Sequence, residues 1–145
     1  KNIGFITKGY IRCYYDINDA EVTTMVLSKH NVVTSHPSFT LQRPSRAYIQ
    51  ALTDCDLLVL SYDSMQELYR QFPKWERLGR LITEQVYGYM EGRVVDYLSL
   101  SPEERYRKMT EESPKLLKNV PLRYIASMLG ITPETLSRIR NKVHK

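Results

Sequence analysis

The chain has 145 residues, 42% of them hydrophobic and 26% charged, a composition ordinary for a soluble globular protein with a hydrophobic core. No apolar run approaches the ~20 residues that a membrane-spanning helix requires, and no signal-peptide pattern is present, so we expect a cytoplasmic protein with no membrane partner. The formal net charge is +5.

The positive charge lies in the last third of the chain. Residues 1–99 carry 11 Lys and Arg against 11 Asp and Glu, whereas residues 100–145 carry 10 against 5. A neutral first part followed by a basic tail is typical of a nucleic-acid-binding segment attached to another domain. Solvated basic faces are also common, so the charge alone does not decide between the two interpretations.

The two cysteines, Cys13 and Cys55, lie far apart and show neither CxxC spacing nor a neighbouring His or Cys cluster. This pattern argues against a disulfide framework and a zinc site, and it fits a reducing compartment. We expect both cysteines to be core or strand residues, and we predict no metal site and no cofactor.

The first part of the chain is predicted to form strands. Residues 10–15 and 21–27 are rich in aromatic and β-branched side chains, which favours a hairpin with a turn of several residues between them. Residues 47–52 and 56–61 indicate a second pair of strands, joined by a short connection. The intervening residues 29–45 contain two prolines and are predicted to be irregular.

The chain opens on a strand-like run, residues 1–5, without a methionine. Four strands with turn-rich spacing need partners at both edges. We therefore expect that the natural protein has a further N-terminal portion before Lys1.

Helices follow the strands. A short helix is predicted over residues 64–71, ending near Phe72-Pro73, and a long one over residues 74–98. The long helix has an apolar stripe at three- and four-residue spacing. The stripe comprises Trp75, Leu78, Ile82, Val86 and Tyr89, with Gln85 on the same side. Packing on the chain's own strands is one interpretation, but a coiled-coil-like homodimer seam is the one we favour.

A further helix is predicted after the long one. Ser101 suits its N-cap, Pro102 its first position, and Glu103 and Glu104 the positive end of its dipole. Ser113-Pro114 is expected to end it.

The segment from Val120 to Lys142 has the parts of a helix-turn-helix in order. Four residues lie on one face of its first helix: Leu122, Ile125, Ala126 and Leu129. Gly130 suits the left-handed turn that ends this helix, Thr132 the cap of the next, and Pro133 its first position. Small Ala126 allows the two helices to cross closely.

The second helix of this motif has two distinct faces. Leu136, Ile139 and Val143 point to one side. The residues predicted to contact base edges point to the other, and they are Glu134, Ser137, Arg138 and Asn141. The residues predicted to contact phosphates are Arg123, Thr135, Lys142 and Lys145. An ordinary helical hairpin with a solvated charged face is the alternative interpretation.

The run "VPLRYIASMLGITPETLSRIR", preceded by "SPEERY", resembles the Crp/Fnr transcription regulators, and most of all the short forms of Bacteroidetes-type bacteria. The resemblance extends over essentially the whole chain and is most specific at its C-terminal end. It implies an α+β fold: a jelly-roll barrel like those that bind cyclic nucleotides (residues 1–73, incomplete), a dimerisation helix (74–99) and a winged-helix-like helix-turn-helix domain (100–145).

The resemblance also implies a function. The family's recognition Glu and Arg correspond to Glu134 and Arg138, while Pro133 departs from the family pattern and predicts a different site preference. The expected partners are double-stranded DNA with an inverted repeat, a second copy of the chain, and RNA polymerase. Only residues 141–145 follow the core of the recognition helix, too few for the family's C-terminal β-wing.

The effector pocket departs further from the cyclic-nucleotide binders. Their Gly-Glu pair is absent from residues 31–37, and their Arg-Ser-Ala position reads Ser45-Arg46-Ala47 here, with the Arg displaced by one residue. A one-residue displacement in a strand moves a side chain to the opposite face. On the dimerisation helix, Met90 and Glu91 replace the polar residues that contact the base. We expect a degenerate pocket that does not bind cyclic AMP, with a cyclic-AMP-responsive regulator as the alternative.

Other effectors and functions receive less support. His30 and His36 lie in a loop and weakly suggest a haem ligand, and an iron–sulfur sensor needs a cysteine cluster that the chain lacks. An unknown small ligand, or no ligand, remains as the expectation. No catalytic triad, paired carboxylates or phosphate loop is present, so we predict no enzyme. A sensing module whose helical tail contacts only proteins is the remaining rival.

Overall fold

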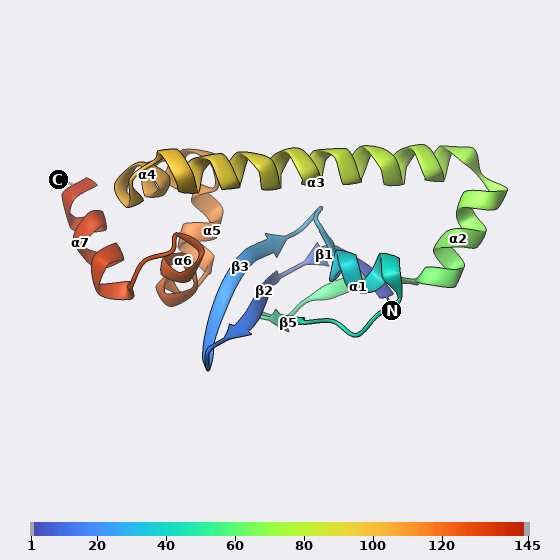
Figure 1. Ribbon diagram of the computed structural model, residues 1–145, viewed down its shortest axis with the longest axis horizontal. Helices are drawn as coiled ribbons and strands as arrows, with labels where there is room; N and C mark the ends of the chain where they lie inside the picture. Colours follow the sequence, from blue (N-terminus) through green and yellow to red (C-terminus); the bar gives the residue numbers. More distant parts are fainter. Residues whose placement is uncertain (1, 144–145) are drawn as a thin grey trace.

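The structure is a computed structural model that describes residues 2–143. Two small sheets lie along one side of a long helix, which connects a short helix at one end to a group of shorter helices at the other (Figure 1). The strands are β1 (Asn2–Lys8), β2 (Tyr10–Ile17), β3 (Ala20–Ser28), β4 (Val32–Val33), β5 (Ala47–Ala51) and β6 (Asp56–Ser61). The helices are α1 (His36–Leu41), α2 (Tyr62–Gln71), α3 (Pro73–Ser99), α4 (Pro102–Glu112), α5 (Pro114–Asn119), α6 (Leu122–Met128) and α7 (Pro133–Val143).

Every strand pair is antiparallel. One sheet has the order β4-β1-β6 and the other β3-β2-β5. The fold is the predicted α+β arrangement of strands, long helix and helix-turn-helix, but the sheets do not close into a complete barrel.

The predicted hairpin is present as β2 and β3, with a tighter turn than we expected. Ile17 pairs with Ala20, so only Asn18 and Asp19 form the turn. Both have positive φ, 53° and 60°, which is the geometry of a two-residue type I′ hairpin turn. Asn and Asp tolerate this left-handed region better than other non-glycine residues, which explains why so short a turn is possible.

The predicted pairing of residues 47–52 with residues 56–61 is wrong, although both strands exist. β5 pairs with β2 in one sheet, and β6 pairs with β1 in the other. The chain changes sheets between them, where the Thr53 hydroxyl accepts a hydrogen bond of 3.0 Å from the Tyr10 amide. The β1–β2 bend at Gly9 lies directly against this corner, and a Cβ on Gly9 (φ +93°) would lie 2.4 Å from the Asp54 carbonyl oxygen.

Three short elements lie in stretches for which we predicted no regular structure. β4 and α1 fall within residues 29–45, and α5 begins at Pro114. The helices α1 and α5 have six residues each, too few to show a periodic pattern. The longer helices agree with the prediction: α2 starts two residues earlier at the Ser61 cap, and α4 has a complete capping box.

The buried residues form two clusters. The smaller lies in the sheets and comprises Ile6, Ile11, Cys13 and Val33. Burial raises the pKa of the Cys13 thiol to about 11, so Cys13 is a neutral core residue, as predicted. The larger cluster lies among the C-terminal helices, and it includes Val26 of β3. Within residues 2–143, no helix is long and apolar enough to cross a membrane.

Candidate nucleic-acid interface

The predicted helix-turn-helix consists of α6 and α7. Gly130 has a φ of +69° in the turn between them, and the Thr132 hydroxyl accepts a hydrogen bond of 3.3 Å from the Thr135 amide. Ala126 of α6 and Leu136 of α7 are both fully buried in the larger core cluster. The predicted turn residue, cap and close crossing are therefore all present.

The polar face of α7 points away from this core. Ile139 and Val143 pack against the cluster beside Leu136. The four residues predicted to contact bases are all exposed, and they are Glu134, Ser137, Arg138 and Asn141. Their spacing of three and four residues places them on one stripe of the helix. The structure thus brings the predicted base-contacting residues together on one exposed surface.

Local contacts set the charge and direction of two of these side chains. The Glu134 amide lowers the pKa of the Glu134 carboxyl, with smaller contributions from the Thr132 hydroxyl and the charge of Arg138. Glu134 is therefore an ionised acceptor at neutral pH. Arg138 donates one hydrogen bond of 3.2 Å to the Thr135 hydroxyl. Its guanidinium has five N–H donors, so most remain available on this surface.

The residues predicted to contact phosphates differ from one another in exposure and in their contacts. Arg123 is exposed and stacks over the Tyr124 ring, 4.7 Å from its centroid. Thr135 is half-buried. Lys142 is exposed but donates to Glu103 of α4 at 2.7 Å, a pairing that the sequence did not predict. Lys145 lies outside the described residues.

The DNA-binding candidate is also docked on the sheets, which the sequence did not predict. α6 packs against β3. The Thr23 amide of β3 donates a hydrogen bond of 2.8 Å to the Ser127 hydroxyl of α6. Arg12 of β2, only 3% exposed, stacks over the Tyr124 ring at 4.2 Å. These contacts join residues about a hundred positions apart, and no local sequence pattern reports such pairs.

The apolar stripe of α3 is largely exposed. No residue of this 27-residue helix is buried. Leu78, Val86 and Tyr89 are 45%, 44% and 49% exposed, and Ile82 is half-buried beside exposed Gln85. Within residues 2–143 the sheets leave this stripe largely uncovered, so packing on the chain's own strands is not seen in this part of the protein.

Several solved structures resemble this chain over nearly its whole length. FixK2 from Bradyrhizobium japonicum superposes with a TM-score of 0.82 at 19% identity, over 99% of this chain and 75% of that one. A CooA mutant from Carboxydothermus hydrogenoformans superposes with a TM-score of 0.76 at 18% identity, over 97% of this chain and 66% of that one. A protein from Eubacterium rectale assigned to the Crp/Fnr family superposes with a TM-score of 0.74 at 14% identity, over 98% of this chain and 68% of that one.

The chain has the Crp/Fnr fold. It spans roughly two thirds to three quarters of the length of these three chains. No sequence-family profile matches it, and no curated protein does. Within residues 62–143 no strand occurs.

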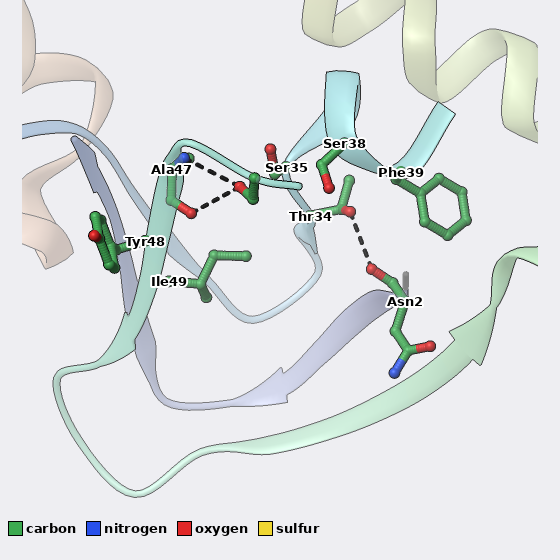
Figure 2. Close-up of a pocket in the computed structure, with 9 residues that line it drawn as sticks. Asn2, Thr34, Ser35, Ser38, Phe39, Ala47, Tyr48 and Ile49 are labelled. Atoms are coloured by element: carbon green, nitrogen blue, oxygen red, sulfur yellow. Dashed lines mark hydrogen bonds between the residues drawn. The ribbon is translucent and has the colours of Figure 1, made fainter. Parts of the chain in front are cut away.

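The strand-bearing part of the fold contains a pocket of about 290 Å³ with mixed polar and apolar lining (Figure 2). Its lining comprises Asn2, Thr34, Ser35, Ser38, Phe39, Ser45, Ala47, Tyr48 and Ile49. Of the predicted pocket residues, Ser45 and Ala47 line it, and they hydrogen-bond to each other. Arg46, Met90 and Glu91 do not line it, and none of the lining side chains carries a charge.

Among residues 2–143, no group of three or more His, Cys, Asp or Glu side chains is placed to hold a metal ion. Here His30 has a positive φ of 75° in a turn, and His36 begins α1.

Proposed function

We propose that this chain is a sequence-specific DNA-binding transcription regulator of the Crp/Fnr type, with α7 as its recognition helix. The observation that carries the proposal is the exposed polar stripe of α7, supported from behind by buried Leu136. Arg pairs with guanine, Asn with adenine, and Glu with the cytosine amino group in the major groove. The basic balance of residues 100–145 supplies the attraction to phosphates.

The regulator is proposed to act as a homodimer joined along α3. The exposed stripe from Leu78 to Tyr89 supports this, since an isolated helix gains little by leaving a row of apolar side chains in water. Two recognition helices related by a two-fold axis enter successive major grooves, so the operator is an inverted repeat with half-sites about one helical turn apart.

The effector pocket is proposed not to bind cyclic AMP. A buried cyclic phosphate needs a compensating cation. The pocket offers hydroxyl and amide groups without a charged side chain, and Arg46, between two lining residues, is exposed and does not line it. Titration calorimetry with cyclic AMP is expected to show no heat of binding. A saturable heat would overturn this part of the proposal and leave the DNA-binding part intact.

DNA binding is tested by selecting duplexes from a random pool with the purified chain and measuring their affinity by fluorescence anisotropy. We expect an enriched inverted repeat and a steep loss of affinity between 50 and 200 mM salt, with a log–log slope of about −0.9 per phosphate contact. A scrambled duplex of the same composition is the control. If no duplex is enriched and the affinity does not depend on salt, the proposal is contradicted, and a helical tail that contacts only proteins is favoured.

A further inference from the structure

An irregularity in β3 faces the helix-turn-helix. The register between β2 and β3 shifts between Cys13 and Tyr14, so that Thr24 is left without a partner residue. Such a bulge turns backbone groups out of the ladder. Here the neighbouring Thr23 amide donates to Ser127 of α6, and the Thr24 carbonyl accepts a hydrogen bond from Arg93 of α3. The Thr23 amide and the Thr24 carbonyl thus each hydrogen-bond to a helix outside the sheet.

Arg93 reaches the helix-turn-helix at the same time. Its second guanidinium nitrogen, Nη2, lies 3.1 Å from the Met128 carbonyl oxygen and 3.1 Å from the Tyr97 hydroxyl. Met128 is the last residue of α6, where carbonyl groups have no partner within the helix and the dipole is negative. Arg93 therefore joins three parts of the fold: the dimerisation helix, the effector sheet and the DNA-binding candidate.

A second arginine completes this junction. Arg105 of α4 donates to the Leu100 carbonyl at 2.6 Å and to the Leu129 carbonyl at 3.1 Å. Tyr97 contacts both guanidinium groups, with its ring centroid 5.6 Å from Arg93 and 4.9 Å from Arg105. The Tyr97 hydroxyl also donates to the Met128 carbonyl. The end of α6 is thus held by cations from two different helices.

We propose that Arg93 is a positioning residue that fixes the orientation of the helix-turn-helix relative to α3 and the β3 bulge. The inference rests on the proposed function for its consequence on DNA, because α3 sets the dimer and α7 reads the operator. Arg93 lies on α3, far along the chain from α7. It acts through the end of α6, and so through the angle at which each recognition helix is presented.

Arginine suits this role better than lysine. Its planar fork donates in two directions at once, to Thr24 on one side and to Met128 on the other. A lysine ammonium supplies the charge but not the fixed geometry. Arg93→Lys is therefore expected to restore part of what Arg93→Met loses.

The first test needs no DNA. Hydrogen exchange measured by mass spectrometry compares wild type, Arg93→Met, Arg93→Lys and a matched control, Arg80→Met, on the exposed side of the same helix. In Arg93→Met we expect residues 20–28 and 122–130 to exchange about tenfold faster, the factor for losing hydrogen bonds to a charged group. The exchange rates of the β1 and β6 segments should be the same as in wild type. Wild-type exchange throughout, or a uniform increase, would overturn the proposal.

A second variant covers the case in which Arg93→Met does not fold. Ser127→Ala removes only the hydroxyl that accepts from the Thr23 amide. It is expected to accelerate exchange over the same two segments, with Thr135→Ala as a control whose effect stays within α7. Unchanged exchange of residues 20–28 in Ser127→Ala would contradict docking at the bulge.

The second readout is the operator. With wild type and Arg93→Met, we expect the same selected half-site but a broader range of half-site spacings in the variant, partly narrowed again in Arg93→Lys. A role in stability alone would lower affinity without changing the spacing preference, and that result would overturn the proposal. If wild type selects no duplex while the exchange result holds, the proposed function fails and the positioning role stands.

Discussion

Arg138 occupies the middle of the exposed face of α7, one turn after Glu134. Its contact with Thr135 stays within the helix, so the guanidinium is free to meet a base edge. We expect Arg138→Ala to weaken binding to the selected operator by about 1–3 kcal/mol and to relax specificity at one base pair. Fluorescence anisotropy with operator variants substituted one position at a time measures both effects.

A matched substitution separates base contact from general charge. Arg140→Ala removes the same charge from the same helix, at a half-buried position off the exposed stripe. It is expected to leave the base preference unchanged. Equal loss for Arg138→Ala on operator and random DNA would make Arg138 a phosphate contact instead.

Gly130 is the residue at which backbone conformation matters most in the helix-turn-helix. Its φ of +69° disfavours any side chain, and an added Cβ would lie 3.2 Å from Cε1 of Tyr97. We expect Gly130→Ala to lower the free energy of unfolding by about 1–2 kcal/mol, the cost of a left-handed residue with a Cβ. Urea denaturation measures it. Gly130→Asn, which tolerates this region, should cost less, and an equal cost would point to the contact with Tyr97 as the cause.

The turn and cap residues of the helix-turn-helix were predictable because their role depends only on the few residues beside them in the chain. Gly130, Thr132 and Pro133 mark a turn, a cap and a first helical position through the local chain alone. Arg12 and Arg93 were not predictable in this way. Their partners, Tyr124 and Met128, lie far along the chain, and a basic residue in a strand or on a helix is ordinarily exposed.

At the scale of elements, the start of α4 gives a prediction about pH. Hydrogen bonds from the Ser101 side chain and then its backbone amide lower the pKa of Glu104. The folded state therefore binds fewer protons than the unfolded state in the acid range, and stability rises with pH there. The contribution is complete above the ordinary Glu pKa of about 4.3 and is lost as pH falls through the folded value.

Glu104→Gln tests this contribution. At pH 7 the variant is expected to be less stable than wild type, and the difference should shrink as pH is lowered below about 4. Thermal unfolding followed by circular dichroism across this range provides the measurement. Glu111→Gln, on the same helix but away from the cap, is the control. A difference that does not change with pH would show that the charge of Glu104 is not involved.

Elements with a strong local pattern were predicted well, and so was the β2–β3 hairpin, but the pairing of β5 with β6 was wrong. The strands β2, β3, β5 and β6 follow from their composition, and the long helix from its apolar spacing. The partner of β5 is decided by the corner at Thr53 and Gly9, where two bends pack together. Such a corner depends on contacts across the sheets, which a strand pattern does not report. The short helices α1 and α5 carry too few residues to show a period.

At the scale of the whole molecule, charge and exposed apolar surface lie on different parts of the chain. The basic excess belongs to residues 100–145, and the largest row of exposed apolar side chains belongs to α3. The junction at Arg93 lies where these two parts meet the sheet β3-β2-β5. Arg93 of α3 therefore contacts β3 and the end of α6 through the same side chain.

The homodimer itself provides the last prediction. Ile82 lies at the centre of the α3 stripe, between Leu78 and Val86. In a dimer seam, Ile82→Glu leaves a carboxylate without a partner, which costs more than the roughly 1–3 kcal/mol of an unsatisfied neutral polar group. We expect wild type to sediment as a dimer and Ile82→Glu as a monomer in sedimentation velocity experiments. Tyr87→Glu places the same charge on the opposite side of α3, at a residue 69% exposed, and should remain dimeric. Dimers of equal stability for both variants would place the interface elsewhere, and then the spacing of the two recognition helices would not depend on α3.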